Sequence, residues 1–256
     1  MSRLGVVGLV SLDRVDGSLP RLGGAPTYAA RALRLLGHPA ALATKIAPED
    51  RPRLAALGLP VAWRPTAKTI AFRIENRGDR RSLTLEEAGE PWTAADAQGW
   101  VGDALRGADI IHAGALTRAD FGSETLARLR RGRRLSLDAQ GLVRGDAPGE
   151  VVLSDDFDPD TLRHVDVLKA SEEEAGELSL AELGVPEVVV TLGRHGVLVH
   201  VNGRTQRVPT RPLRGVDTTG AGDAWITTYL SYRIRRHGPR SAAQLANELV
   251  HALLSA

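Results

Sequence analysis

The strongest chemical pattern in the sequence is the run Gly215-Val-Asp-Thr-Thr-Gly-Ala-Gly-Asp-Ala224. Gly220, Ala221 and Gly222 stand just before a helix-forming segment, where consecutive backbone N–H groups and the helix dipole favour an anion such as a phosphate. Asp223 falls in the first helical turn, where a carboxylate can accept a proton from an attacking hydroxyl while the amides hold the phosphoryl group. The pattern predicts phosphoryl transfer with Asp223 as the base.

A simpler interpretation of this run is a Gly-rich turn in which Asp223 only complements the helix dipole. A lone Gly-x-Gly-Asp would favour that interpretation, but the whole string from Asp217 to Asp223 is far more specific. The run is not a Walker loop, because Ala221 stands where such a loop needs Lys.

Elements that could position this run alternate between strand and helix along the chain. The apolar segment 4–10 predicts a buried strand, and Gly23-Gly24-Ala25-Pro26 opens a helix that Gly37 closes. Further strands are predicted at 39–45, 108–113, 133–138, 166–169, 187–192, 197–201 and 205–208, and further helices at 49–58, 94–106, 120–131, 172–179, 221–236 and 241–254. Such alternation predicts a mostly parallel sheet covered by helices, with ligands at the carboxyl ends of its strands.

The segment 68–85 interrupts this alternation. Its flanks alternate apolar and polar residues around a polar turn at 76–79 that contains Gly78, which predicts a hairpin. We expect it to form a lid at about residues 65–90, with Phe72 either closing over substrate or packing beneath the flap. Because the hairpin leaves a strand edge that a second copy could cover, a homodimer through the lid is also predicted.

Composition narrows the class of protein. The 256 residues are 43% hydrophobic and 25% charged, which suits one domain over residues 1–256. The absence of Cys excludes disulfides, thiolate zinc sites and Cys nucleophiles. No apolar run approaches the ~18 residues of a membrane-spanning helix, and the first ten residues do not resemble a signal peptide, so a cytoplasmic location without a membrane partner is expected. The Arg cluster at 128–134 has no aromatic platform beside it and is expected to be a solvated helix end without nucleic acid.

The run from Asp217 to Asp223 resembles the C-terminal Asp-Thr-x-Gly-Ala-Gly-Asp signature of the ribokinase-like (PfkB) sugar kinase family. The resemblance covers nearly the whole chain. Gly23-Gly24 is similar to the family's substrate-side di-glycine, the hairpin at 68–85 occupies the place of its lid, and 191–196 looks like its nucleotide-side loop. This resemblance implies a three-layer ribokinase-like α/β fold, with a mostly parallel central sheet flanked by helices and a small β lid.

The resemblance also implies roles for individual residues. Asp223 would be the base, and the amides of Gly220, Ala221 and Gly222 would form the anion hole. Substrate hydroxyls would be held by Asp13 and by the backbone at Gly23 and Gly24. The nucleotide site would be lined by Thr191, Gly193, Gly196, Asp217, Thr219 and Asn247. The implied cofactors are ATP and Mg²⁺, with a monovalent cation as an additional option. The implied acceptor is a small sugar, polyol or nucleoside.

Among the departures from the family's pattern, two concern candidate site residues. Ser171 stands where many members have the Asn of Asn-x-x-Glu, although Glu174 keeps the Glu that helps to place magnesium through water. Ser-x-x-Glu is also a capping box, and the capping and metal roles can coexist. Tyr28 replaces an Asn that often touches sugar hydroxyls, which indicates a different substrate, stacking on a ring, or simply a core tyrosine.

A further candidate group follows the strand at 133–138. Asp138 and Gln140 stand on the expected ligand side, and Arg144 could hold a phosphate with two parallel hydrogen bonds. The alternative is a loop held together by local Asp and Arg contacts. Similar Asp-x-Gln-Gly strings occur in members that resemble inositol or nucleoside kinases, which is an analogy only.

The hypothesis that follows is an ATP-dependent phosphotransferase acting on a hydroxyl of a small sugar, an inositol-like polyol or a nucleoside. A sensor that binds nucleotide or sugar without catalysis stays open because of Ser171. A dehydrogenase is disfavoured, because no Gly-x-Gly-x-x-Gly follows the first strand.

Overall fold

The computed structural model describes residues 3–77, 80–180, 182–213 and 215–255. Within these residues a nine-stranded sheet forms the centre of the molecule, in the order β14-β13-β12-β11-β9-β8-β1-β4-β5. The strands from β12 to β5 are parallel to their neighbours, and β13 and β14 continue the sheet in antiparallel fashion. The strands are Leu4–Gly8 (β1), Ala40–Ile46 (β4), Val61–Pro65 (β5), Ile110–Gly114 (β8), Arg134–Asp138 (β9), Val167–Ser171 (β11), Glu187–Thr191 (β12), Val197–Val201 (β13) and Arg204–Val208 (β14).

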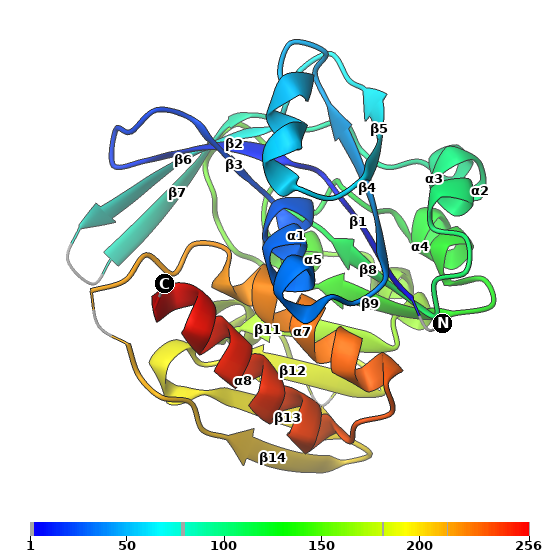
Figure 1. The fold of residues 1–256 in the computed structure, drawn as a ribbon, viewed down its shortest axis with the longest axis vertical. Helices are drawn as coiled ribbons and strands as arrows, with labels where there is room; N and C mark the ends of the chain where they lie inside the picture. Colours follow the sequence, from blue (N-terminus) through cyan, green and yellow to red (C-terminus); the bar gives the residue numbers. More distant parts are fainter. Residues whose placement is uncertain (1–2, 78–79, 181, 214, 256) are drawn as a thin grey trace.

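Helices cover both faces of this sheet, as Figure 1 shows. Side chains that alternate along a buried strand separate two cores: Leu4 and Val6 of β1 belong to one hydrophobic cluster and Val7 to the other. The first cluster packs against α1 (Ala25–Leu36), α7 (Ala221–Ile234) and α8 (Pro239–Ser255). The second packs against α2 (Ala94–Gln98), α3 (Trp100–Ala104), α4 (Ser123–Arg130) and α5 (Gln140–Val143). The predicted three-layer α/β fold is confirmed.

A second sheet of five strands in the described chain, ordered β10-β7-β6-β2-β3, stands beside the central one. Its strands are Ser11–Val15 (β2), Arg21–Gly23 (β3), Ala71–Arg77 (β6), Arg80–Glu87 (β7) and Gly149–Glu150 (β10). The predicted hairpin corresponds to β6 and β7, which project from the body in Figure 1. Of the turn predicted at 76–79, Asn76 and Arg77 instead belong to β6, and residues 78 and 79 lie outside the described residues. The strand predicted over 4–10 ends at Gly8, and β2 of the second sheet begins three residues later at Ser11.

Several element boundaries differ from those predicted. The helix predicted over 94–106 is broken at Gly99 into α2 and α3, and the first of these begins with a capping box between Thr93 and Asp96. The segment predicted as a helix over 49–58 is a 3-10 helix over Arg51–Leu57, and β5 was not predicted. The predicted helix at 172–179 is the short α6, Glu172–Gly176. The described chain contains no helix that combines the length and apolar character needed to cross a membrane.

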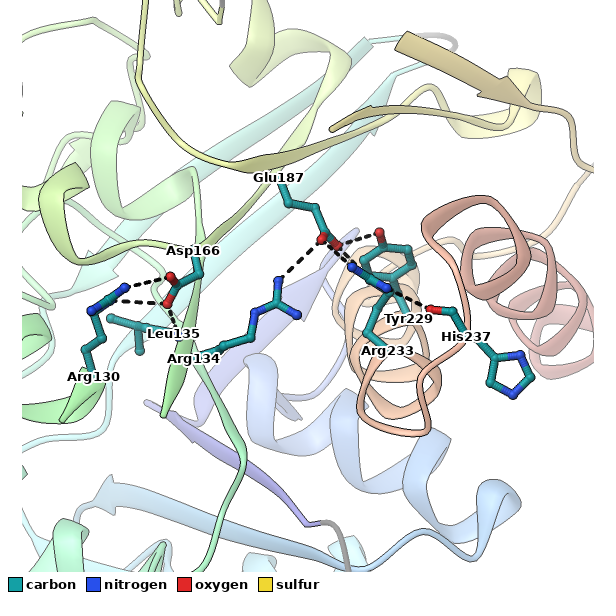
Figure 2. A network of polar contacts seen from close by, with 8 residues as sticks. All are labelled: Arg130, Arg134, Leu135, Asp166, Glu187, Tyr229, Arg233 and His237. Carbon is teal, nitrogen blue, oxygen red and sulfur yellow. Dashed lines mark hydrogen bonds and ion pairs between the residues drawn. The ribbon is translucent and has the colours of Figure 1, made fainter. Parts of the chain in front are cut away.

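A buried polar network connects the amino ends of β9 and β12 to α7 (Figure 2). These amino ends lie at the edge of the sheet opposite the carboxyl ends of the strands. Glu187, the first residue of β12, is 2% exposed. Its carboxylate accepts hydrogen bonds from Tyr229 (2.6 Å), Arg233 (2.8 Å) and Arg134 (3.3 Å). Burial opposes ionisation of Glu187, but Arg233 and Tyr229 outweigh it, so the pKa of this carboxyl lies below its ordinary value. These hydrogen bonds hold α7 against the sheet, and α7 is the helix that begins at the Gly-rich run.

Candidate active site

A cavity of about 1680 Å³ lies between the lid and the carboxyl ends of the parallel strands. The five-stranded sheet that carries the β6–β7 hairpin, called the lid from here on, contributes Asp13 and Phe72 to its wall. The central sheet contributes Lys169 and Thr191, and the start of α7 contributes residues 220–223. Ligands of open α/β sheets bind at this edge. Asp13, Phe72, Thr191 and residues 220–223 are far apart in the sequence, but they line one cavity in the fold.

The Gly-rich run forms the start of α7, and its backbone conformation there disfavours residues that have a side chain. Gly220 is the N-cap residue and has a left-handed backbone with φ of 76°. A side chain at this position would also collide with the ring of Tyr28, which packs against it. The N–H of Ala221 donates to the carbonyl of Thr218 (3.0 Å), so this amide is already engaged within the turn. The first N–H groups of a helix have no partner within it, so the anion-binding role of the Gly220 and Gly222 amides stays a prediction that this structure leaves open to a ligand.

Asp223 is half-buried and lines the cavity. Burial in the cavity wall and the nearby carboxylate of Asp138 raise the pKa of Asp223 to about 6, although Lys169, His112 and Arg144 act in the opposite direction. A carboxyl group with this pKa is ionised at neutral pH and still basic enough to accept a proton. The predicted base therefore stands where it faces ligand space.

A buried polar cluster lies beneath the start of α7, on three adjacent strands. Asp138 at the end of β9 is completely buried and forms ion pairs with Lys169 of β11 (Nζ–Oδ1, 3.1 Å) and His112 of β8 (Nε2–Oδ2, 3.2 Å). His112 also shares a hydrogen bond with Ser136 (Nδ1–Oγ, 3.2 Å). Asp138 is absent from the cavity wall, so its predicted contact with substrate is corrected: the strand's pleat directs it towards Lys169 and His112. Lys169, which was not predicted, reaches the cavity in its place.

Arg144 and Glu174 form an ion pair of 2.9 Å that lines the cavity. Glu174 is 2% exposed, and its second carboxylate oxygen accepts a hydrogen bond from the backbone N–H of Ser171 (2.8 Å). The Ser171 hydroxyl in turn accepts from the N–H of Glu174 (3.2 Å), so the predicted capping box is present. The role of Glu174 towards magnesium stays a prediction, and so does the contact between Arg144 and a phosphate.

On the substrate side, Asp13, Gly24, Tyr28, Phe72 and Gln140 line the cavity. Phe72 is 3% exposed and also belongs to the hydrophobic core, so it packs under the lid while one part of it faces the space. The ring of Tyr28 is covered by Arg31 at 5.2 Å, and burial raises the pKa of its hydroxyl. Gly23 is not in the wall, which corrects its predicted position. A side chain there would collide with Asp13 and Ser11, so Gly23 lets these two polar side chains pack closely behind the surface.

Of the residues predicted to line a nucleotide site, Thr191, Gly193, Gly196, Thr219 and Asn247 line the cavity, and their contact with nucleotide stays a prediction. The amide group of Asn247 is already engaged: its oxygen accepts from the Trp225 indole N–H (2.7 Å), and its NH₂ donates to the carbonyl of Pro209 (2.9 Å).

The predicted position of Asp217 is corrected, because it lies outside this wall and borders a smaller neighbouring cavity of about 390 Å³. It accepts hydrogen bonds from the N–H of Thr219 (2.9 Å) and from Arg21 of the lid (2.6 Å). Although burial opposes ionisation, these contacts lower the pKa of Asp217 to about 2. Asp217 therefore ties the turn before the anion hole to the lid.

A divalent cation finds no ready-made protein cage here. Within the described ranges, no three His, Cys, Asp or Glu side chains are grouped as metal ligands. Mg²⁺ is commonly bound through one or two carboxylates, several waters and the phosphates of a substrate. Glu174, the residue predicted to place magnesium through water, lies in the cavity wall with Asp223, so the metal would be held by such carboxylates, water and the phosphates of the donor.

Residues 20–254 match the model of the pfkB family carbohydrate kinases. The chain belongs to this family. Among curated relatives, a fructokinase of Klebsiella pneumoniae is 36% identical over 100 residues, which are 34% of this chain and 32% of the relative. An inositol 3-kinase of Zea mays is 35% identical over 130 residues, which are 48% of this chain and 34% of the relative. The chain thus spans about a third of the length of the curated relatives it matches.

Solved structures with the same fold are similar over almost all of the chain. A pyrophosphate-dependent kinase in the ribokinase family, complexed with a pyrophosphate analog and myo-inositol, has a TM-score of 0.85 at 24% identity and covers 98% of this chain and 95% of its own. A nucleoside kinase of Burkholderia thailandensis in complex with inosine has a TM-score of 0.75 at 19% identity, with coverages of 99% and 91%. These likenesses confirm the ribokinase-like fold.

Proposed function

We propose that the protein transfers a phosphoryl group from ATP to a hydroxyl of a small polyol, with Asp223 as the general base. The observation that carries this proposal is the position of Asp223 in the first turn of α7, beside the amides of Gly220 and Gly222, in the cavity beneath the lid. A carboxylate and an anion-binding helix start that face one space are what phosphoryl transfer to a hydroxyl requires.

An inositol-like polyol is the acceptor that we favour. Asp13 and Gln140 offer polar groups to hydroxyls from two sides of the cavity, and the Phe72 and Tyr28 rings leave an apolar wall for a ring face. The inositol 3-kinase relative and the structural neighbour complexed with myo-inositol support this choice. Sugars and nucleosides are the alternatives in the same class.

ATP is the donor that we propose, lying across the loops at 191–196 and 217–222. Beyond the phosphate-binding end, the cavity wall contains the apolar side chains of Val216, Val250 and Leu254, which suit the adenine ring of ATP. Pyrophosphate is the donor to be compared with it, because the neighbour with a TM-score of 0.85 is described as pyrophosphate-dependent.

In the proposed reaction the acceptor hydroxyl oxygen attacks the terminal phosphorus in line with the bond that breaks. The oxygen that bridges the terminal phosphorus to the rest of the donor leaves with the bonding electrons, and the hydroxyl proton passes to the Asp223 carboxylate. The amides of Gly220 and Gly222 hold the charge of the phosphoryl group in transit. Mg²⁺ bound to the donor would neutralise part of the phosphate charge. The lid, through Asp13 and Phe72, keeps water out of the cavity.

We further propose that two copies of the chain associate through the lid. The lid sheet ends at β3 and β10, and within the described residues no further strand pairs with their outer edges, so a second copy could cover these edges.

The first test replaces the base. Asp223→Asn keeps the shape of the side chain but removes the proton acceptor, so we expect kcat to fall by roughly 10²–10⁴-fold. The assay measures phosphorylated product from myo-inositol, fructose, ribose and inosine, each with ATP and with pyrophosphate. Asp160→Asn, a change at a surface acid, is the matched control and should leave kcat unchanged.

Two outcomes would contradict the proposed function. An Asp223→Asn protein that is folded and retains most of its kcat would remove Asp223 from the mechanism. Binding of donor and acceptor by the wild-type protein without product from any pair would favour the non-catalytic sensor.

A further inference from the structure

The Gly-rich run carries no cation of its own, because Ala221 stands where a Walker loop has Lys. The fold brings an ammonium group to this point from another element. Lys169 lies on β11, more than fifty residues earlier in the chain, and its side chain lines the cavity. A Cβ built on Gly222 would lie 2.8 Å from Lys169 Nζ. Gly222 is thus the residue that lets this ammonium approach the start of α7.

Lys169 is held there with its charge. It is only 3% exposed, and a lone buried ammonium would be costly, but Asp138 pairs with it at 3.1 Å. The second oxygen of Asp138 faces His112, so this carboxylate is fixed from both sides. Burial opposes protonation of Lys169, yet Asp138 and then Glu174 and Asp223 outweigh it and raise the pKa of the ammonium. His112 and Arg144 are the other side chains that lower the pKa of Asp223 from the packed neighbouring elements.

The choice of Lys is also informative in this chain. The thirty-three Lys and Arg residues include only three Lys, at positions 45, 68 and 169. An ammonium is a compact point charge, whereas a guanidinium is a wide planar fork.

We propose that Lys169 is a catalytic residue that binds the phosphoryl group in transit, and that Asp138 is its positioning residue. This inference rests on the proposed function. The ammonium donates hydrogen bonds to a non-bridging oxygen of the donor's terminal phosphate, opposite the amides of Gly220 and Gly222. Lys169 keeps all its protons through the reaction. The proton of the hydroxyl still passes to Asp223, and the bridging oxygen still leaves with the bonding electrons.

The competing explanation is that Lys169 only neutralises Asp138 in the interior. That role would need no access to the cavity and no approach to Gly222, both of which the structure has. The two explanations differ in what happens to anion binding when both charges of the pair are removed together.

The decisive variant is therefore Lys169→Met combined with Asp138→Asn, which leaves no unpaired buried charge. We expect pyrophosphate, used as the probe, to bind at least tenfold more weakly by titration calorimetry, and kcat to fall by roughly 10²-fold or more, while the KM of the acceptor changes little. Lys45→Met is the matched control. Lys45 is equally buried at 3% exposed and is paired with Glu90 and Asp96, but it does not line the cavity. It should lose stability and keep pyrophosphate affinity.

A second measurement uses the wild-type protein and does not depend on the folding of any Lys169 variant. With ¹³C-labelled lysine the chain gives three Cε signals, which Lys45→Arg and Lys68→Arg assign by elimination. Pyrophosphate should shift the Lys169 signal and leave the other two almost unchanged.

The possible outcomes distinguish a failure of the role proposed for Lys169 from a failure of the proposed function. Unchanged pyrophosphate affinity in the double variant, or an unmoved Lys169 signal when pyrophosphate is bound, would overturn the role of Lys169. Absence of turnover with every donor and acceptor would refute the proposed function, and the binding and spectroscopic arms would still decide whether Lys169 contacts phosphate.

Discussion

Asp223 combines a position in the first turn of α7 with a pKa raised to about 6 by burial and by the Asp138 carboxylate. Only the ionised carboxylate can accept the hydroxyl proton, so we expect kcat/KM to fall about tenfold per pH unit below pH ~6 and to level off above it. The measurement is a pH profile with pyrophosphate or ATP as donor, with the fold monitored at each pH. Lys169→Met should move this limb to higher pH, because the ammonium lowers the pKa of Asp223. A profile without a limb between pH 5 and 7 would contradict the assignment.

Single residues could be predicted from the sequence where their chemistry is written into a local string. Asp223 and Gly220 belong to one run of ten residues, and the Ser171–Glu174 capping box is a four-residue pattern. Lys169 and His112 could not be found in this way, because what makes them part of the site is the lateral order of β8, β9 and β11. The only local signal was a charged residue inside an otherwise apolar strand.

Among the elements, the Glu187 network at the amino end of β12 should determine stability rather than chemistry. The pKa of Glu187 is lower in the folded state than its ordinary 4.5. Its contribution to stability is therefore present above pH ~4.5 and is lost as the pH falls through the folded-state value. Glu187→Gln should cost about 3 kcal/mol of unfolding free energy at pH 7, since it breaks a buried charged network. Urea unfolding at pH 7 and at pH 4 should show this difference shrinking in acid.

The control for that measurement is Glu124→Gln. Glu124 pairs with Arg128 on the surface of α4 and is 72% exposed, so its loss should cost less than about 0.5 kcal/mol at either pH. A folded Glu187→Gln protein that is as stable as wild type would show that the network contributes little. Its kcat should stay near the wild-type value, because the network lies away from the carboxyl ends of the strands (Figure 2).

Periodicity predicted most of the central elements, because buried strands and helices bounded by Gly and Pro leave clear patterns. It failed where tertiary pairing decides. Ser11–Val15 is short and half polar, and it forms a strand because β3 and β6 pair with it on either side. The break at Gly99 is instead local, since this residue interrupts a helical pattern that would otherwise continue from 94 to 106.

For the whole molecule, the proposed association through the lid predicts a mass of twice 27.4 kDa. Leu19, in the loop between β2 and β3, is 88% exposed. An interface that buried this apolar side chain would gain free energy of association. Leu19→Asp should therefore shift the species towards the monomer in sedimentation velocity. Leu35→Asp is the matched control, because Leu35 is 62% exposed but lies on α1. A wild-type protein that sediments as a monomer at micromolar concentration would refute this association.

The scarcity of lysine has a practical consequence for following lid motion. Two of the three ammonium groups are buried, at positions 45 and 169, and only Lys68 is open to solvent, with 64% of its side chain exposed. Lys68 stands just before β6, at the base of the lid hairpin. Among the three lysines, an amine-reactive fluorophore would thus select Lys68 without any engineering, and its emission would report opening and closure of the flap as ligands arrive.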